Sequence, residues 1–537
     1  MKKKIVLALS LVCLLSGCQT GKESGTNVSG SMASSGNVSS RPKGEEKIYS
    51  METPLYIGIA SGDVRVVAPE GSTRVGVSPF NTTIQGRLYY YEGGFDKDDL
   101  RVIASDFNSL FCYYHALSDN HYDYRQVTER DDRGNAINRK QIINVKYLND
   151  HPDTDIEVDP FLFDLIKTSY DFTINSSLLF NRFSESLSSL YEKKLSEDEY
   201  SGKALNKALS LATNVRFKDD FTEEEISNAR KSVPSSLDEA KNSITFHPEK
   251  HTIRLNTIIR DGKRIVPRMN LGGSAKGFAT KKVAEYFEQV YPGISLMINS
   301  GSSSILAVGS RPDDKPWKIS YTNPVYKEQR MDGKKNPAER YLEFSGSFNR
   351  STSGYYEHYF YCYNQETKEI HRRDHIFNTE NGFSSPFFDQ VSVIINDTGI
   401  ADRYTTAIRN TKSVQEAYGL FKKLNAIYSF DGDLMLCYKG KKKDEDSLYS
   451  YTRNSLSPLS DKGYPISVLN DGSEYKGDYS DLSASSISTV KTKNNFDFSE
   501  IYLRTDKRYQ SAHLFTNVTP SYFPYPENSI SVLKALK

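Results

Sequence analysis

Apolar residues recur along the chain at two spacings, and these spacings predict a mixture of helices and strands. Residues 158–190 carry apolar side chains at steps of three and four, as at Phe161, Leu165 and Tyr170, which predicts one long helix. Alternating positions predict strands, for example at residues 86–92. The other expected helices are residues 100–113, 221–231, 401–409 and 413–424, and the other expected strands are residues 55–59, 243–255, 294–308, 317–321, 341–348, 356–363 and 390–395. Because the two kinds of element do not alternate strictly, we expect an α+β fold rather than a doubly wound sheet.

The first residues have the layout of a secretory signal. Lysines at positions 2–4 precede an apolar run at residues 5–15, and small residues then lead to Cys18. The run is too short to remain in a membrane as a spanning helix. The cysteine after the small pair resembles a bacterial lipobox. This resemblance implies cleavage before Cys18, a lipid on its sulfur, and a protein anchored to the cell membrane on the extracytoplasmic face; a plain signal peptide with an incidental cysteine is the alternative.

Composition divides the remainder of the chain. Residues 19–47 are rich in Ser, Gly, Asn and Lys and have too few large apolar residues to fold, which predicts a flexible tether. Residues 441–446 run basic and then acidic, and Ser, Asp and Tyr dominate afterwards. The sequence therefore predicts a signal peptide at residues 1–18, a tether at 19–47, a folded domain at 48–440 and a C-terminal extension of unknown role at 441–537. The extension is either a small separate module or an elaboration of the domain.

Charge and cysteine usage exclude several classes of function. The formal net charge is +1, so no basic field favours nucleic acid as a partner. Beyond the signal, the cysteines are Cys112, Cys362 and Cys437, which cannot all pair and include no Cys-x-x-Cys spacing. We therefore expect neither a disulfide framework nor a zinc site.

A glycine-rich string begins at Asn270 and reads Asn-Leu-Gly-Gly-Ser-Ala-Lys-Gly-Phe-Ala, after which apolar residues continue at helical spacing. Its glycines let the backbone approach a ligand closely, and Ser274 is a candidate helix cap. Free backbone N–H groups and the helix dipole favour an anion at such a helix start, with Lys276 as a second positive element. A plain glycine turn before an amphipathic helix is an alternative interpretation of the same string.

Three further segments follow this string in order. The second begins at Ile298 and reads Ile-Asn-Ser-Gly-Ser-Ser-Ser, with Arg-Pro-Asp at residues 311–313 and Pro-Trp at 316–317. The third reads His-Ile-Phe-Asn from His375, with a glycine at 382, and the fourth reads Ala-Asp-Arg-Tyr-Thr-Thr-Ala from Ala401. In order and spacing, the four segments resemble the motifs of the FAD:protein FMN transferases, the ApbE-type flavin transferases. The resemblance covers residues 48–440 and implies an α+β, ApbE-like domain of the T-fold type.

The resemblance also implies a metal site. Asp402 and Thr406 are one helical turn apart, so both oxygens lie on one face of a helix. In the family these two side chains and a backbone carbonyl of the glycine-rich turn, here that of Gly273, hold Mg²⁺, a cation that prefers oxygen ligands. An Asp/Thr pair that merely decorates a helix is the alternative.

Further site residues follow from the same motifs. Asp402 and His375 are the catalytic candidates; the alternative for His375 is a structural histidine. The positions that match residues contacting FAD are Met51, Tyr114, Phe180, Asn270, Lys276 and Phe377. Of these, the first three are also compatible with ordinary core packing.

The chain departs from the family pattern at several of these positions. Asn270 replaces an aspartate, Asn378 stands where an aspartate is common, and Glu52 replaces a glycine. Leu178-Leu179 replace a pair of small residues, and Glu380 would repel a nearby pyrophosphate. The metal and phosphate contacts are retained, but the flavin pocket is altered.

Three functions are compatible with these motifs. The first is Mg²⁺-dependent transfer of FMN from FAD, the substrate, to a Thr or Ser hydroxyl of an extracytoplasmic acceptor protein, with release of AMP. The second is hydrolysis of FAD to FMN and AMP. The third is a catalytically impaired lipoprotein that only binds flavin.

Overall fold

The computed structural model describes most of the chain in separate ranges. The described ranges are 46–52, 66–67, 79–133, 136–196, 217–291, 293–311, 313–321, 340–344, 346–363, 370–385, 387–430, 432–439, 448–452, 466–469, 487–490, 513–515 and 530–533. All of them belong to one unit, Glu45–Lys537. The predicted signal peptide with Cys18, the predicted strand at residues 55–59 and nearly all of the predicted tether lie outside the described residues.

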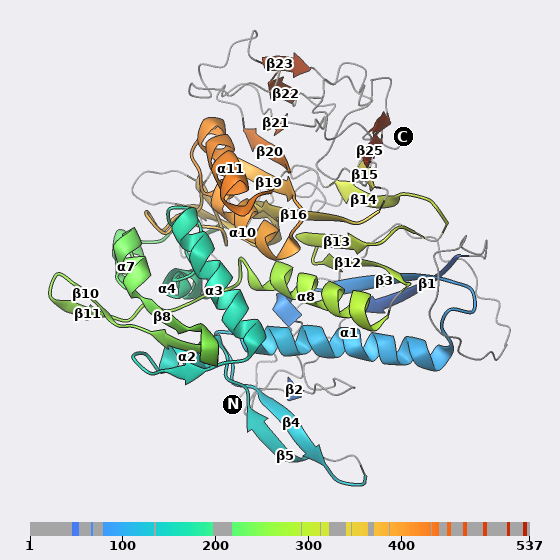
Figure 1. The fold of residues 1–537 in the computed structure, drawn as a ribbon. Coiled ribbons are helices and arrows are strands. Elements are labelled where there is room, and N and C mark those ends of the chain that lie inside the picture. Colours follow the sequence, from blue (N-terminus) through green and yellow to red (C-terminus); the bar gives the residue numbers. More distant parts are fainter. Residues whose placement is uncertain are drawn as a thin grey trace, which may run out of the picture. The chain divides into compact units, whose positions relative to one another are not determined.

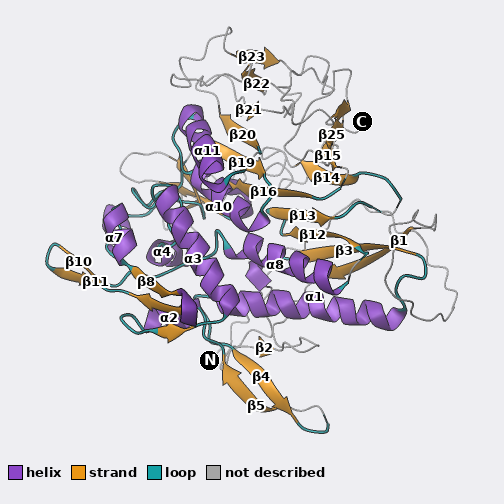
Figure 2. Ribbon diagram, in the orientation of Figure 1, coloured by secondary structure: helices purple, strands orange, loops and turns teal. Residues whose placement is uncertain are grey.

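The central element is a ten-stranded sheet (Figures 1 and 2). Its strands, in spatial order, are β1 (Glu46–Glu52), β3 (Ile84–Tyr91), β12 (Ser295–Ser300), β13 (Ser304–Val308), β16 (Phe348–Gly354), β19 (Phe388–Ile394), β20 (Asp433–Lys439), β21 (Leu448–Thr452), β22 (Ile466–Leu469) and β23 (Ile487–Val490). Neighbouring strands are antiparallel except for β21 and β22. The described residues of β19 are buried along its whole length, as expected for a strand covered on both faces.

Helices cover the sheet and position the site. The helices are α1 (Lys97–Ser118), α2 (Val145–Asp150), α3 (Pro160–Asn175), α4 (Glu185–Ser196), α6 (Glu223–Arg230), α7 (Leu237–Asn242), α8 (Ala275–Val290), α10 (Thr398–Arg409) and α11 (Val414–Tyr428). Helix α8 contacts β12 and β13, α10 contacts β13, β16 and β19, and α1 packs against α8 and β1. The mixed elements confirm the α+β class.

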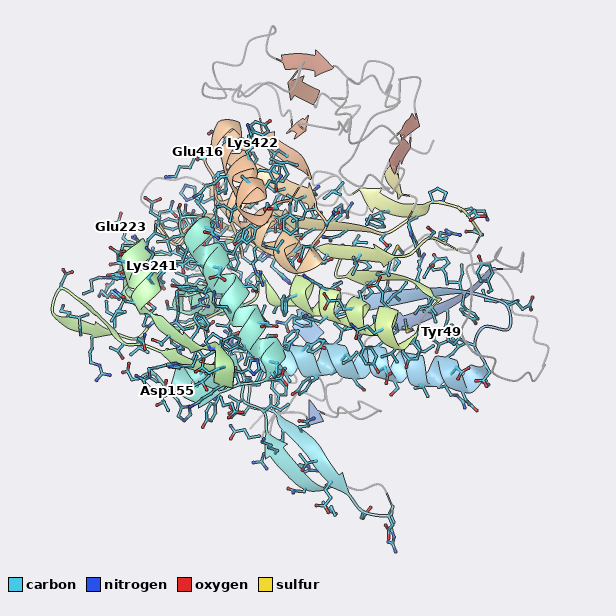
Figure 3. The ribbon with its side chains drawn as sticks, viewed as in Figure 1. Tyr49, Asp155, Glu223, Lys241, Glu416 and Lys422 are labelled. Carbon is cyan, nitrogen blue, oxygen red and sulfur yellow. The ribbon has the colours of Figure 1, made fainter. Side chains whose placement is uncertain are left out.

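Smaller sheets surround this core. They are β10 (Ile258–Arg260) with β11 (Lys263–Ile265); β6 (Ile156–Glu157), β9 (Thr252–Leu255) and β8 (Ile244–His247); β2 (Val66–Val67), β4 (Arg125–Arg130) and β5 (Ala136–Gln141); β18 (Ile370–Asp374), β17 (Tyr359–Tyr363) and β7 (Phe217–Asp219); and β14 (Trp317–Tyr321), β15 (Arg340–Phe344), β25 (Ile530–Leu533) and β24 (His513–Phe515). Exposed charged side chains such as Asp155, Glu223, Lys241 and Glu416 lie on the outer surface (Figure 3).

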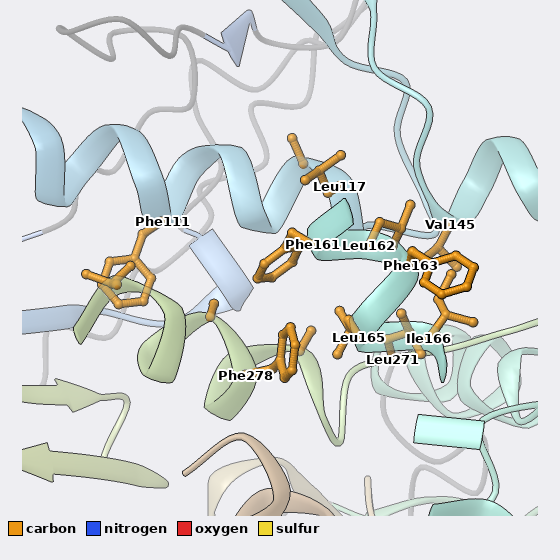
Figure 4. Packing of buried hydrophobic residues seen from close by; sticks show 14 of the residues in the cluster. Phe111, Leu117, Val145, Phe161, Leu162, Phe163, Leu165, Ile166, Leu271 and Phe278 are labelled. Atoms are coloured by element: carbon orange, nitrogen blue, oxygen red, sulfur yellow. The ribbon is translucent and has the colours of Figure 1, made fainter. Parts of the chain in front are cut away.

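Helix α1 shows how the sequence directs these elements. Asp96 accepts hydrogen bonds from the N–H groups of Asp98 and Asp99, and the side chain of Asp99 accepts one from Asp96 N–H, which forms a capping box. Apolar residues four apart, Ile103 and Phe107 among them, are fully buried. Figure 4 shows the cluster that α1 shares with α3 and α8. Burying each large side chain contributes about 1.5–3 kcal/mol.

The single helix predicted at residues 158–190 is wrong. The structure has two helices, α3 and α4, and the turn between them includes Ser177 and Leu178 with φ of 54° and 66°. The hydroxyl of Ser176, at the end of α3, accepts a hydrogen bond from Phe180 N–H at 3.2 Å. The apolar side chains in this turn are half-buried and prolong the helical pattern, which hides the break. The turn carries Phe180 toward the site described below.

Most of the other described predictions agree with the structure, but the strand predicted at 356–363 begins with a 3-10 turn at Tyr355–Glu357, and the one predicted at 341–348 covers most of β15 and the first residue of β16. The helices predicted at residues 100–113, 221–231, 401–409 and 413–424 are α1, α6, α10 and α11. The predicted strand at 243–255 is interrupted by a 3-10 turn at Pro248–Lys250, and the one at 294–308 is a hairpin. In the part of the chain that the structure describes, no helix is both long enough and apolar enough to cross a membrane.

Strands of the C-terminal extension pair with strands of the preceding domain. β21 lies antiparallel to β20, with Met435 opposite Thr452, and β25 lies antiparallel to β15. These pairings join the described strands of residues 441–537 to sheets formed by earlier residues. The domain boundary at residue 440 stays a prediction.

Candidate functional site

The glycine-rich turn leads directly into α8. The side-chain oxygen of Asn270 accepts a hydrogen bond from Gly272 N–H at 2.8 Å, which fixes the turn. Ser274 occupies the N-cap position, but its side chain does not cap the helix; its hydroxyl donates instead to the carbonyl of Leu271. The expected side-chain cap is therefore wrong. Since no described residue accepts a hydrogen bond from the N–H groups of Gly273 and Lys276, this helix start remains open to an anion.

Asp402 joins α10 to this helix start. One carboxylate oxygen accepts a hydrogen bond from Gly277 N–H at 2.7 Å. The other accepts hydrogen bonds from the hydroxyls of Ser304 and Ser351, which face each other on β13 and β16. The residue is only 6% exposed, so four segments hold this carboxylate in one position.

Gly277 allows α8 and α10 to approach closely. A Cβ atom at this position would lie 2.5 Å from the carbonyl oxygen of Thr398 and 2.7 Å from a carboxylate oxygen of Asp402. Both distances are well inside van der Waals contact, so only glycine fits here. The contact brings Asp402 against the first turn of α8.

Thr406 lies one turn further along α10 and faces Gly273. Its hydroxyl donates to the backbone carbonyl of Asp402 at 3.0 Å, which leaves the oxygen lone pairs available. A Cβ atom on Gly273 would lie 3.3 Å from that hydroxyl oxygen. Gly273 and Thr406 are half-buried, and Gly272 is exposed, so this corner reaches solvent. The structure thus brings together the three residues predicted to hold the metal.

The donors at this corner fit Mg²⁺. A carboxylate, a hydroxyl and a backbone carbonyl are all oxygen ligands, and Mg²⁺ completes its shell with waters and substrate phosphates. Among the described residues, no group of three or more His, Cys, Asp and Glu side chains could hold a metal ion.

Lys276 and Phe180 flank the same corner. Lys276 is half-buried on the first turn of α8, and its ammonium forms no ion pair with the described residues. A Cβ atom on Gly273 would lie 3.2 Å from Cε2 of Phe180. Phe180 is 4% exposed and also packs edge-on against Phe172, so it is both a wall of the corner and part of the core.

Asn410, which ends α10, connects the two loops beside Phe180. Its amide donates to the carbonyls of Leu179 at 3.0 Å and Phe377 at 3.2 Å. Asn181 adds a second link, because its amide donates to the hydroxyl of Thr379 at 3.3 Å. The turn before Phe180 and the loop after His375 are therefore held to each other and to α10.

His375 begins this second loop, and its side chain reaches solvent while neighbouring protein atoms desolvate part of the ring. Its Nδ1 lies 3.2 Å from the carbonyl oxygen of His358, so a neutral ring donates there and keeps Nε2 as an acceptor. Desolvation lowers the pKa of His375 more than Asp374 raises it, and Lys276 lowers it further. The imidazole is thus neutral at neutral pH and lies within electrostatic reach of Lys276. Phe377, two residues on, stacks on Tyr191 with ring centroids 5.0 Å apart.

A buried ion pair fixes the start of the His375 loop. Arg409 of α10 donates to Asp374 at 2.9 Å, and the two side chains are 0% and 1% exposed. The other carboxylate oxygen of Asp374 accepts a hydrogen bond from Ile376 N–H at 3.0 Å. Helix α10 therefore orients both the Asp402 corner and the strand end that precedes His375.

Asp220 contacts His371 and Arg373 of β18, and its contribution to stability depends on pH. Arg373 donates to both of its oxygens, at 2.9 and 2.7 Å. Desolvation raises the pKa of Asp220, but the hydrogen bonds from Arg373 and His371 outweigh this effect and lower the pKa below the ordinary value of 3.8. A depressed carboxyl pKa contributes stability above the unfolded-state pKa, and this contribution is lost as the pH falls through the folded-state pKa.

We expect Asp220→Asn to lower the free energy of unfolding at neutral pH by about 2 kcal/mol, because it weakens a buried charged hydrogen-bond pair. The difference from the wild type is expected to shrink as the pH falls below 3.8. Urea unfolding at neutral and acidic pH measures both values. An equal loss at both pH values would contradict the assigned role of the carboxylate.

Met51 lies in the core, and Tyr114 is half-buried and packs against the same core cluster. Met51 is 2% exposed and packs where a Cβ atom on Gly86 would lie, beside Phe107. Tyr114 stacks on Phe161 with ring centroids 4.0 Å apart. This packing is compatible with a core role for both residues. Their role in binding FAD stays a prediction.

A cavity of about 470 Å³ lies between the Leu178-Leu179 turn and the loop of residues 378–380. Arg230, Lys231 and Arg260 add positive charge to its lining, and Arg230 donates to the carbonyl of Thr379 at 3.3 Å. Among the departures from the family pattern, Leu178, Leu179, Asn378 and Glu380 therefore line one space. Glu380 is exposed and pairs with Lys412 at 3.7 Å, which offsets its charge.

No sequence pattern identifies Ser304 as a partner of Asp402, and none points to Ser351, to Asn410 or to Glu185, which contacts Asn270 at 3.0 Å. Ser304 belongs to the second motif, but its contact with Asp402 depends on the pairing of β13 with β16. The others belong to no motif, and only the fold brings them to the site.

The model of the ApbE family matches residues 136–427. Similar solved structures include the ApbE protein of Thermotoga maritima, with 20% identity over 66% of this chain and 91% of that chain and a TM-score of 0.44. They also include the flavin transferase ApbE of Vibrio cholerae, with 14% identity over 76% and 97% and a TM-score of 0.48. A third is the flavinyl transferase ApbE of Pseudomonas stutzeri, with 16% identity over 74% and 93% and a TM-score of 0.44.

None of the curated proteins matches the sequence. The structural similarities are too distant to assign an activity, and the family match carries the assignment. The family model covers more than half of the chain and includes the glycine-rich turn, His375, Asp402 and Thr406. The chain therefore belongs to the ApbE family, the FAD:protein FMN transferases that its four motifs resemble.

Proposed function

We propose that the protein transfers FMN from FAD to a Thr or Ser hydroxyl of an extracytoplasmic acceptor protein, with release of AMP and with Mg²⁺ as cofactor. One observation carries this proposal: Gly273, Asp402 and Thr406 converge at an open helix start that also presents Lys276. Oxygen ligands for a divalent cation beside free N–H groups and an ammonium suit a pyrophosphate.

The residues of this corner bind and orient the substrate. The N–H groups of Gly273 and Lys276 and the ammonium of Lys276 hold the pyrophosphate of FAD. Asp402, Thr406 and the carbonyl of Gly273 would hold Mg²⁺, which neutralises phosphate charge and acts as a Lewis acid when bound. Because hydrogen bonds from Gly277 and two serines fix Asp402, its charge needs no reorganisation during the reaction.

In the proposed transfer, the acceptor hydroxyl oxygen forms a bond to the phosphorus on the FMN side. The bond from that phosphorus to the bridging oxygen breaks, and AMP leaves with that oxygen. The hydroxyl proton passes to Nε2 of His375, since Nδ1 lies against the carbonyl of His358. Catalysis of this kind depends mainly on positioning and on neutralising charge.

The place of action follows from the sequence alone. We propose that a lipid on Cys18 anchors the protein to the extracytoplasmic face of the cell membrane, and that residues 19–47 let the domain reach acceptor proteins.

The test is an assay of the full-length chain in detergent with FAD, Mg²⁺ and a flavin acceptor protein. In-gel fluorescence is expected to show covalent flavin on the acceptor. Chelation of divalent cations is expected to lower the rate by about a hundredfold or more, because the pyrophosphate charge is then uncompensated. Added Mg²⁺ restores the rate.

The other outcomes contradict the proposal and identify the alternatives. Release of AMP without any acceptor would show that the protein hydrolyses FAD. Binding of FAD without turnover would show an impaired flavin-binding lipoprotein. Labelling that is unaffected by chelation would remove the proposed role of Mg²⁺.

A further inference from the structure

A buried carboxylate lies directly behind the glycine-rich turn, outside the four motifs. Glu185 is the first residue of α4 and is only 6% exposed. One of its oxygens accepts a hydrogen bond from Ser189 at 2.6 Å, and the other accepts hydrogen bonds from the side-chain amides of Asn120 and Asn270. Among the described residues, three hydrogen-bond donors and no acceptor contact these oxygens, as is typical of an ionised carboxylate.

The contact with Glu185 determines which way the amide of Asn270 points. Its nitrogen donates to Glu185 at 3.0 Å, so its oxygen faces Gly272 and accepts the N–H group of that residue at 2.8 Å. The backbone of Asn270 is held as well, through a 2.7 Å hydrogen bond to the carbonyl of Arg182. The amide therefore connects a buried charge on one side to the glycine-rich turn on the other.

We propose that Glu185 positions Asn270 and, through it, the glycine-rich turn that binds FAD, and that the negative charge of this corner lies on residue 185 instead of residue 270. The proposal rests on the proposed function only for the identity of the ligand. Desolvation raises the pKa of Glu185, against the effects of Ser189, His121 and Asn270. The site therefore tolerates one carboxylate, and a second would be opposed by burial and by like charge.

This arrangement explains the departure at position 270. An aspartate there would place a carboxylate oxygen about where the amide nitrogen now lies, 3.0 Å from an oxygen of Glu185. The family pattern by itself predicts that an aspartate at position 270 would strengthen FAD binding. The geometry predicts the opposite, unless Glu185 is neutralised at the same time.

The experiment compares Asn270→Asp, Glu185→Gln and the double variant by titrating FAD against flavin fluorescence. Asn270→Asp is expected to weaken FAD binding by about tenfold, and the double variant is expected to bind within about twofold of the wild type. In the double variant, the glutamine amide can donate to the new carboxylate, while the amide of Asn120 rotates. In the transfer assay, KM for FAD is expected to rise in Asn270→Asp while kcat changes by less than about threefold.

Glu192→Gln is the matched control. It removes a second carboxylate on α4, one that pairs with His121 at 3.5 Å and does not contact Asn270. FAD affinity is expected to be unchanged. The proposal is overturned if Asn270→Asp binds FAD as tightly as the wild type, or if the double variant binds no better than Asn270→Asp.

Melting temperatures without FAD separate this proposal from the proposed function. If the wild type does not bind FAD, the proposed function fails, but the two substitutions should still be coupled. The double variant should then melt higher than Asn270→Asp alone. If the two effects on melting temperature simply add, Glu185 and Asn270 act independently and the positioning role is excluded.

Discussion

Asp402→Asn is expected to lower kcat/KM for flavin transfer by about a thousandfold while the protein stays folded. An asparagine at this position can rotate so that its oxygen accepts the N–H group of Gly277, and its nitrogen then donates to the hydroxyls of Ser304 and Ser351. The hydrogen bonds are retained and only the charge is lost. The loss of activity therefore measures how much the negative charge of Asp402 contributes to holding the metal ion.

Asp397→Asn is the matched control for that experiment. Asp397 caps the start of α10 and pairs with Lys281 at 2.6 Å, but it does not face Gly273 or Thr406. Since asparagine is also a good cap, activity is expected to fall by less than about threefold. Equal losses in the two variants, or a folded Asp402→Asn protein with wild-type turnover and wild-type Mg²⁺ dependence, would refute the assignment of Asp402. Circular dichroism and melting curves establish that each variant is folded.

Gly277→Ala is expected to lower the free energy of unfolding by about 3 kcal/mol. The new methyl group would lie 2.5 Å from the backbone carbonyl of Thr398, and a backbone atom cannot rotate away as a side-chain tip can. To relieve the clash, α8 and α10 must separate. The N–H group of Gly277 then moves away from Asp402, so flavin transfer should fall together with stability.

Gly419→Ala provides the comparison, because Gly419 lies inside α11 and a Cβ atom there would meet nothing within 4 Å. Alanine is favoured over glycine in a helix by up to about 1 kcal/mol, so this variant should be as stable as the wild type or slightly more stable. Denaturant unfolding measures both. A Gly277→Ala protein with wild-type stability would show that the helices can separate at no cost.

The parts of the site that follow from the sequence are those encoded locally. Asp402 and Thr406 are four residues apart on a helix, so their shared face could be inferred without the structure. The resemblance to a family added Gly273, which the structure places beside Thr406. In the same way, the α+β class could be inferred because segments with helical spacing of apolar residues and segments with strand spacing do not alternate strictly along the chain.

The remaining features depend on contacts between distant segments, which local patterns do not record. Ser304 and Ser351 reach one carboxylate because β13 pairs with β16 in a register that sets them opposite each other. The break between α3 and α4 was missed because it uses Ser177 and Leu178, not glycine, at positive φ. Glu185 begins the second of these helices, so the error in the helix prediction also hid the carboxylate behind Asn270.

The amide of Asn410 has a mechanical consequence. Asn410, which caps the C-terminal end of α10, donates to the carbonyl of Leu179, which lines the cavity, and to that of Phe377, which directly precedes the cavity-lining residues 378–380. A molecule that moves these two loops apart must therefore break the hydrogen bonds of Asn410 or displace α10. We therefore expect a molecule that fills the cavity to shift Asp402 as well, although the cavity lining does not include Asp402.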